Sequence, residues 1–308
     1  MLEERMLERI ANARVFGKHP FGVFLRINEW MWSHVPSSVS GLRPFRSYGR
    51  LLHSLVRRQV NREMFLGTFF LRNRPELELM RRVSRLVRNG APAKIAVLGC
   101  SNGAEVYSIA WALRSSDRST PVALQAVDIS AKAVEVAREG VYSFGVSQLV
   151  REPVLERMSA EELSEMFDRD GPRLSIKPWI KAGIAWHVGD AGDPRLVRQL
   201  GPQDIVVANR FLCHMVPEEA ERILRNIGRL VAPGGYLFVS GVDLDVRTKV
   251  ASDLHWNPVP ELLEEIHEGD ARLRADWPCK YWGLEPLDQR RSDWRIRYAS
   301  VFRIDRAS

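Results

Sequence analysis

Residues 94–108 read KIAVLGCSNGAEVYS, and residues 122–130 read VALQAVDIS. Together they describe a strand, a glycine turn, a helix and a second strand that ends in an acid. The apolar run 95–98 predicts a buried strand. Gly99 and Gly103 allow the backbone to turn tightly and to come close to a ligand. Strand and helix patterns keep alternating from 94 to 248, so the sequence predicts an α/β fold with a mostly parallel sheet.

The polar groups of this stretch are placed to bind an adenosyl group. The helix that begins near Val106 directs its first amides toward the turn. Asp128 ends the second strand at the carboxyl edge of the sheet, where a carboxylate can accept hydrogen bonds from two ribose hydroxyls. The third glycine of G-x-G-x-x-G is missing, which counts against NAD. The alternative is that Asp128 only caps helix 131–139, although Ser130 fills that position better.

Composition narrows the class of protein. Hydrophobic residues make up 45% of the 308 residues, as in packed globular proteins. We expect no membrane span, because no apolar run reaches about 18 residues, and no secretion signal. The three cysteines have no CxxC spacing, so we expect no metal site, no disulfide framework and a cytoplasmic location.

Positive charge is concentrated near the N-terminus. Residues 1–60 contain ten Lys/Arg and four Asp/Glu, which accounts for most of the net charge of +7. Such a segment can recruit an acidic partner or a membrane surface, although a solvated helical face is the more common reason. No RNA-binding motif accompanies it, so we expect no nucleic-acid partner.

The chain divides into two predicted regions, a helical N-terminal region at 1–88 and a catalytic domain at 89–308. An aromatic-rich insertion at about 249–294 precedes a last strand predicted at 297–304, which would pair with strand 236–242. Five aromatic residues of this region could line a substrate pocket or pack into a lid core: Trp256, Trp277, Tyr281, Trp282 and Trp294.

Several separate segments agree with one known family. Residues 68–72 read TFFLR, 103–108 read GAEVYS, 128–130 read DIS with GVY at 140–142, and 230–238 read LVAPGGYLF. In this order they resemble the T-x-F-F-R-D, G-E-E-P-Y-S, D-I-D…G-x-Y and L-x-P-G-G-x-L-F segments of the chemotaxis receptor methyltransferases, the CheR family. The resemblance covers roughly residues 65–245 plus the closing strand. It implies a Rossmann-like adenosylmethionine methyltransferase sheet, with a small β-subdomain at about 168–188.

The resemblance also implies a set of cofactor contacts. Glu105 would pair with the ammonium of S-adenosylmethionine, Asp128 would hold the ribose, and Asp190 would lie near the adenine. The expected cofactor-binding residues are Gly99, Gly103, Glu105, Asp128, Ile129, Asp190 and Asn209. Glu105 could otherwise be an ordinary acid of a first helical turn, and Asp190 a loop residue.

Arg72 would lie near the sulfonium, where it could hold an acceptor carboxylate with two hydrogen bonds. Asn209 and Arg210 would border the methyl-transfer site. His214 could serve as a general base, or could be a polar residue at the mouth of a helix. The expected catalytic residues are Arg72, His214, Asn209 and Arg210; without the resemblance, Arg72 would be read as a surface residue.

The acceptor side departs from the family pattern. The family's C-R-N is here Ala208-Asn209-Arg210, and His214 stands where the family has a tyrosine. We therefore expect direct in-line methyl transfer to an oxygen or nitrogen of a specialised acceptor, a small molecule or a protein. Two alternatives remain: a protein-glutamate methyltransferase acting on a chemoreceptor, and a non-catalytic adenosylmethionine-binding module that docks a partner.

Overall fold

The computed structural model describes residues 67–87, 91–143, 154–269 and 287–305, together with the single positions 24, 27, 28, 31, 44 and 48. Most of the predicted helical region 1–88 therefore lies outside the described residues, as do Trp277, Tyr281 and Trp282. Among the described residues, no helix is both long and apolar enough to cross a membrane, and no group of three or more His, Cys, Asp or Glu side chains could hold a metal ion.

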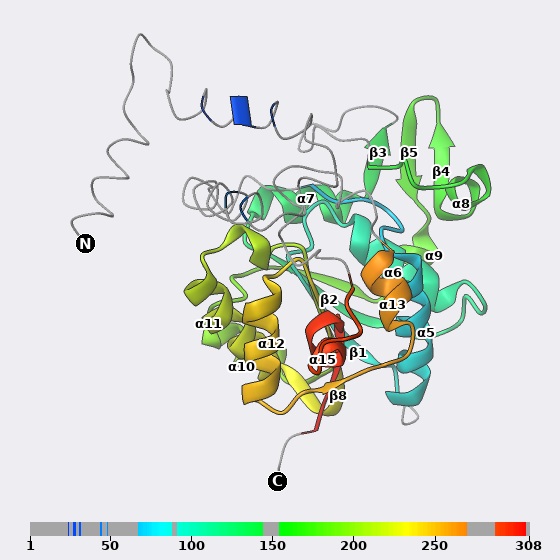
Figure 1. The fold of residues 1–308 in the computed structure, drawn as a ribbon. Helices are drawn as coiled ribbons and strands as arrows, with labels where there is room; N and C mark the ends of the chain where they lie inside the picture. The colour runs from blue at the N-terminus through cyan, green and yellow to red at the C-terminus, as the bar shows by residue number, and fades with distance from the viewer. Residues whose placement is uncertain are drawn as a thin grey trace.

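A mostly parallel sheet forms the centre of the molecule (Figure 1). Seven strands of the described chain lie in the order β6-β2-β1-β7-β8-β10-β9. Their bounds are β1 Lys94–Leu98, β2 Ala123–Asp128, β6 Ile184–Val188, β7 Gln203–Asn209, β8 Val231–Ser240, β9 Asn257–Pro258 and β10 Val301–Ile304. Only β10 runs antiparallel to its neighbours β8 and β9. The predicted fold class is confirmed, including the late antiparallel pairing of β8 with the closing strand.

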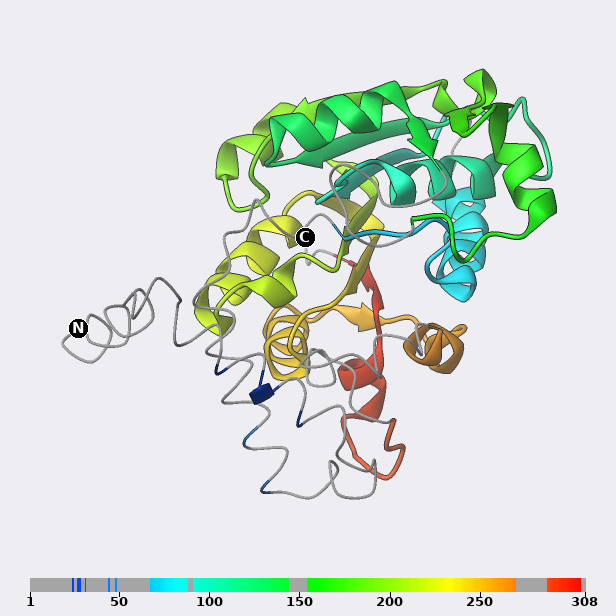
Figure 2. The same ribbon diagram turned by 90° about the horizontal axis from the view of Figure 1, so that it is seen from above.

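Helices cover both faces of this sheet, because successive strand residues point to opposite sides. Ile95 and Val97 of β1 belong to the core beneath α5 (Arg74–Val87) and α6 (Ala104–Arg114), whereas Ala96 and Leu98 belong to the other core. That second core packs beneath α10 (Pro194–Leu200), α11 (Pro217–Gly228) and α12 (Leu244–Asp253). Figure 2 shows the same two layers from above.

The predicted helix boundaries after β2 are confirmed. Helix α7 spans Ala131–Glu139, the hydroxyl of Ser130 accepts a hydrogen bond from the amide of Ala133, and Gly140 ends the helix at φ 60°. Asp193 caps α10 in the same way, ahead of the proline that occupies the first turn. These caps satisfy amides that a helix cannot pair internally.

A small antiparallel sheet lies beside the main one, with different boundaries from the predicted 168–188. It consists of β3 (Val141–Ser143), β5 (Arg173–Ile176) and β4 (Phe167–Asp170), in that order. Residues 184–188 instead form β6 of the main sheet, parallel to β2. Arg114 explains the correction: its guanidinium donates to the carbonyls of Ile180 and Ala182 and holds the returning chain against the main sheet.

The C-terminal prediction is also partly wrong. Residues Trp294–Tyr298 form the short helix α15, so the last strand begins at Val301 rather than at 297. The amide of Arg297 bonds to the carbonyl of Asp293, and its side chain pairs with Asp245 at 2.8 Å, which favours the helical turn. Trp256 is 4% exposed and packs on Phe302, so it belongs to the core and not to a substrate pocket.

Candidate functional site

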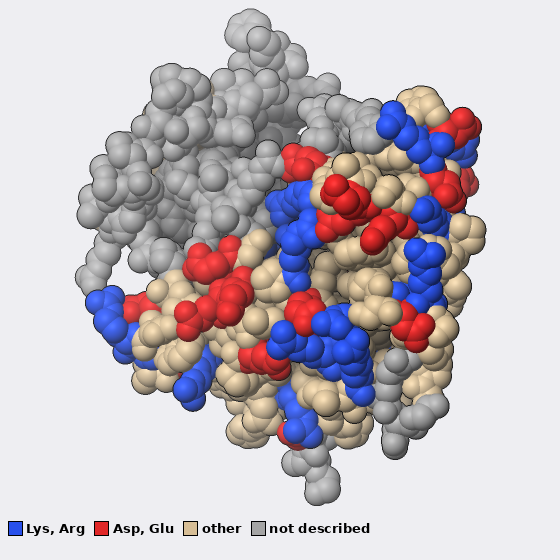
Figure 3. All heavy atoms as spheres, turned by 90° about the vertical axis from the view of Figure 1, so that its right-hand side faces the viewer, with Lys and Arg blue, Asp and Glu red and all other residues tan. Residues whose placement is uncertain are grey.

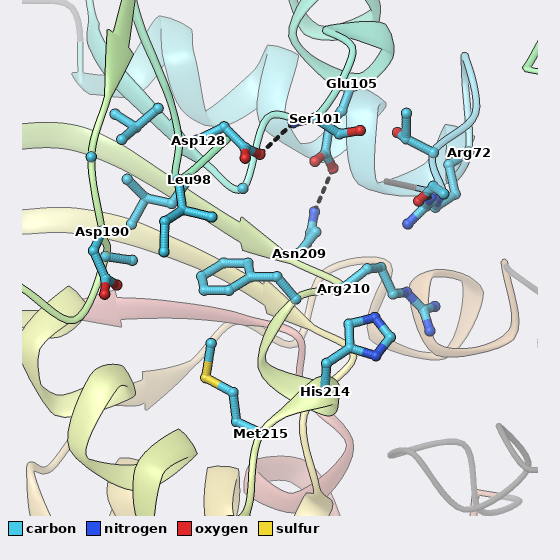
Figure 4. A pocket seen from close by; sticks show the side chains of 18 residues that line it. Arg72, Leu98, Ser101, Glu105, Asp128, Asp190, Asn209, Arg210, His214 and Met215 are labelled. Atoms are coloured by element: carbon cyan, nitrogen blue, oxygen red, sulfur yellow. Dashed lines mark hydrogen bonds between the residues drawn. The ribbon is translucent and has the colours of Figure 1, made fainter. Parts of the chain in front are cut away.

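A pocket opens where four neighbouring strands end at their carboxyl edge. It encloses about 800 Å³ of empty space, part of it open to solvent. Its walls follow β1, β2, β6 and β7, and the segment before α5 closes one side (Figure 4). The lining residues are Gly67, Thr68, Arg72, Leu98, Gly99, Ser101, Glu105, Val127, Asp128, Ile129, Gly189, Asp190, Ala191, Asn209, Arg210, Phe211, His214 and Met215. Ligands of open α/β sheets bind at this edge.

Asp128 holds the glycine turn in place. One carboxylate oxygen accepts from the amide of Ser101 at 2.7 Å and the other from the amide of Ser130 at 2.9 Å. Burial raises the pKa of Asp128, and these amide hydrogen bonds oppose that shift. Each oxygen keeps capacity for another donor from the pocket. Since Ser130 caps α7, the capping alternative for Asp128 is not what the structure shows.

The backbone of the turn is unusually constrained. Gly99 has φ 69°, and a Cβ there would lie 2.8 Å from the ring of Phe211. Ser101 also has a positive φ, as does Arg210 in the lining of the same pocket. Non-glycine residues in this region cost energy, and such strain tends to concentrate at functional sites.

A buried amide joins two carboxylates in the middle of the pocket. The side-chain nitrogen of Asn209 donates to Glu105 at 2.8 Å and to Glu76 at 2.7 Å. The hydroxyl of Ser240 donates to the amide oxygen of Asn209 at 2.7 Å and thereby fixes which way the amide faces. Burial raises the pKa of Glu105, whereas Arg72, the hydrogen bond from Asn209 and Arg210 lower it.

Two guanidinium groups and an imidazole occupy the end of the pocket remote from Asp190. Figure 4 shows Arg72, Arg210 and His214 on the same side, across from Asp190 and beyond Asn209. Arg72 donates to the carbonyl of Gly67 at 3.1 Å and lies over the ring of Phe69. Arg210 follows β7 at φ 64°, and its amide bonds to the carbonyl of Ser240. Arg72 and Arg210 give this end two positive charges, which lower the pKa of Glu105 and can also attract a negatively charged group.

Two distant sequence segments meet to place Arg72. The amide of Leu71 donates to the hydroxyl of Ser108 on α6 at 2.9 Å. The ring of Phe70 packs edge-on against Tyr142 and Phe167 at 5.0 and 5.2 Å between centroids. The segment 68–72 is thus anchored on α6 and on the small sheet, which fixes the backbone from which Arg72 extends.

The structure brings nine of the ten predicted site residues to this pocket: Arg72, Gly99, Glu105, Asp128, Ile129, Asp190, Asn209, Arg210 and His214. Gly103 is not among the lining residues. It precedes α6 at φ 88°, and a Cβ there would lie 3.0 Å from Ala137 and 3.2 Å from Trp186. Its visible role is close packing of α6 against the adjoining elements.

Sequence reasoning missed Ser101, Phe211, Met215 and, most importantly, Glu76. Glu76 and Glu78 lie two residues apart on the same helix, and the local sequence does not indicate which of the two side chains is buried.

Comparisons with known proteins agree with this geometry. The family profile described as "CheR methyltransferase, SAM binding domain" matches residues 67–248. "Chemotaxis protein methyltransferase Cher2" of Pseudomonas putida is 26% identical over 247 residues, covering 73% of this chain and 86% of that protein. A protein of Rhodobacter capsulatus described as "Uncharacterized 104.1 kDa protein in hypE 3'region" is 26% identical over 208 residues, and the match spans 66% of this chain but only 19% of that protein.

Among solved structures, the N-methyltransferase NodS of Bradyrhizobium japonicum in complex with S-adenosyl-l-homocysteine matches with 16% identity and a TM-score of 0.35. The match covers 67% of this chain and 87% of that one.

Proposed function

The chain belongs to the CheR methyltransferase family, and from that membership we propose that its pocket transfers a methyl group from S-adenosylmethionine to a carboxylate oxygen. The single observation that carries the choice of acceptor is the pair Arg72 and Arg210, which line the end of the pocket beyond Glu105. Two guanidinium groups suit a planar anion.

The residues of the other end fit the cofactor. Asp128 lies beside the glycine turn, at the carboxyl edge of the sheet. Its carboxylate oxygens can each accept a further hydrogen bond. Ile129 is 36% exposed in the same wall and offers an apolar surface for the adenine, and Asp190 lies beside it. Glu105 faces the pocket as an acid suited to an ammonium group. When bound, the cofactor supplies a methyl group on a positively charged sulfur.

The chain's own contribution to the reaction is orientation. A carboxylate acceptor is already ionised, so no residue must remove a proton from it. Arg72 and Arg210 would hold the acceptor in line with the methyl group, and positioning of this kind is worth several kcal/mol of activation free energy. Phe69 and Phe211 border the same space and help to exclude water.

His214 supports a second candidate. Its imidazole lines the same end of the pocket, where it could accept a proton from an amine or hydroxyl acceptor. The family's tyrosine at this position would not titrate near neutral pH, so the exchange favours base catalysis if the acceptor is less acidic than a carboxylate.

The test is transfer of labelled methyl from S-adenosylmethionine to a cell extract whose groups have been blocked selectively. Carbodiimide coupling of the extract's carboxyl groups to an uncharged amine should abolish labelling, whereas acetylation of its amines should leave labelling intact. The reverse pattern would favour the second candidate. If neither the blocked extracts nor the untreated extract is labelled, the non-catalytic binding module is favoured. The size of the labelled product separates a protein acceptor from a metabolite.

We propose that the reaction takes place in the cytoplasm, because the two cysteines of the described residues, Cys100 and Cys213, form no disulfide there, as suits a reducing compartment. An acidic partner for the basic residues 1–60 remains part of the proposal, and those residues lie almost wholly outside the described ones.

A further inference from the structure

Helix α5 carries one glutamate that does not behave like its neighbours. Glu78 has a side chain that is 34% exposed and pairs with Arg81 and Arg82. Figure 3 shows such charges of both signs intermixed over the face that carries α5. Glu76 is 5% exposed and turns inward instead, away from these ion pairs. A carboxyl group buried without a cationic hydrogen-bond partner is costly, so its position calls for a functional reason.

Glu76 lies in a small extension of the main pocket. This extension shares Arg72, Glu105, Asn209 and Arg210 with the main pocket and adds Glu76 to the lining. One nitrogen of Asn209 donates to an oxygen of each glutamate, so the two carboxyl groups lie on either side of a single amide. No other hydrogen bond of the Glu76 carboxyl is seen with the described residues.

The charges around Glu76 leave it short of positive compensation. Burial and the neighbouring Glu105 raise the pKa of Glu76 to about 7. The hydrogen bond from Asn209 and the charges of Arg210 and Arg72 act in the opposite direction but do not cancel the shift. A cation placed beside Glu105 would stabilise both ionised carboxylates at once.

We propose that Glu76 and Glu105, bridged by Asn209, together form the subsite for the cofactor's ammonium group, and that binding expels a proton from Glu76 to solvent. This inference rests on the proposed function and adds Glu76 as a positioning residue of the same site. The O–H bond of the neutral Glu76 carboxyl breaks, its electron pair stays on the oxygen, and buffer takes up the proton. The ammonium then balances the second negative charge.

The consequence is an affinity that depends on pH. Below about pH 7 the cofactor must displace a proton from Glu76, so binding weakens as the pH falls. One such proton makes the Kd about tenfold higher at pH 6 than at pH 8. Glu105 and the ligand's own amine also titrate, so the diagnostic quantity is the difference between the wild type and a variant that lacks only the Glu76 proton.

Calorimetry with S-adenosylhomocysteine on the full chain tests this. At pH 8, Glu76→Gln should bind with a higher Kd than the wild type. Between pH 8 and pH 6, the Kd of the wild type should rise about tenfold more than the Kd of Glu76→Gln. Glu78→Gln, on the exposed side of α5, is the matched control and should keep the wild-type profile. The wild type should release about half a proton on binding at pH 7. Its binding enthalpies in phosphate and in Tris should therefore differ by about half of the difference between the ionisation enthalpies of the two buffers.

Identical pH profiles for wild type and Glu76→Gln, or no proton release by the wild type, would overturn the inference. The acceptor plays no part in these measurements. A methyltransferase that labels amines instead of carboxylates would therefore refute the proposed acceptor and leave this inference standing. Failure of the wild type to bind S-adenosylhomocysteine at either pH would refute both.

Discussion

The two halves of the pocket are built in different ways. The half around Asp128 comes mainly from one continuous segment, residues 94–130, joined by Asp190, and is fixed by the backbone amides of Ser101 and Ser130. The half around Asn209 joins segments that lie far apart: its amide binds carboxylates 133 and 104 positions earlier in the chain. The first half is a short, local arrangement of the backbone that suits one cofactor. The second is a network of buried charges that contains the proposed ammonium subsite and borders the two guanidinium groups proposed for the acceptor.

The largest expected effect comes from the local half. Asp128→Ala removes the acceptor of two amide hydrogen bonds and, on the proposed function, the acceptor of the ribose hydroxyls. Hydrogen bonds to a charged group contribute about 1.5–3 kcal/mol each, so the affinity for S-adenosylhomocysteine should fall about a thousandfold. Calorimetry measures it, with Asp117→Ala on a remote turn as a control. An unchanged Kd would show that the cofactor does not use Asp128.

Arg72 tests the networked half. Arg72→Ala should lower kcat about a hundredfold through lost orientation of the acceptor, while the Kd of the cofactor changes by less than about threefold. Single-turnover kinetics and calorimetry separate the two quantities, and Arg82→Ala on the exposed side of α5 provides the comparison. An equal loss in kcat and affinity would make Arg72 a contact of the cofactor and not of the acceptor.

In the absence of cofactor, the buried Glu76 carboxyl should lower the free energy of unfolding. Its folded-state pKa of about 7 lies above the ordinary value of 4.5, so the folded protein binds the proton more tightly than the unfolded chain. Stability is therefore lost as the pH rises from 4.5 to about 7. Glu76→Gln should raise the free energy of unfolding by about 3 kcal/mol at pH 8 and by less than about 1 kcal/mol at pH 5. Urea denaturation at pH 5 and pH 8 measures the free energy of unfolding. An equal stabilisation at both pH values would contradict the assigned titration of Glu76.

His214 should have the smallest effect. If the acceptor is a carboxylate, His214→Gln should change kcat/KM by less than about threefold and leave its pH dependence unaltered. A general base contributes about 10²–10⁴-fold, so a loss of that size would transfer the assignment to an amine or hydroxyl acceptor. Initial rates between pH 6 and pH 9 distinguish the two results.

The sequence predicted the local half well because its signals are local. Buried strands, turn glycines and helix caps act over a few residues, and Ser130 caps a helix with the expected bounds, Ala131–Glu139. The failures involve long-range contacts. Strand β6 was assigned to the wrong sheet because its place depends on parallel pairing with the distant β2 and on Arg114, which holds the segment just before β6. Glu76 was missed because its burial depends on Asn209, and α15 was read as strand because its pairing with α12 leaves no periodic signal.

The most direct test of the central claim, that the networked half presents a carboxylate to the methyl donor, is the stability of the product to mild base. The purified chain is incubated with tritiated S-adenosylmethionine and extract, and the labelled product is treated at about pH 11. A methyl ester hydrolyses there, so the label should leave as volatile methanol, and Arg72→Ala should yield little of it. Label that remains on the product and does not become volatile would contradict the account.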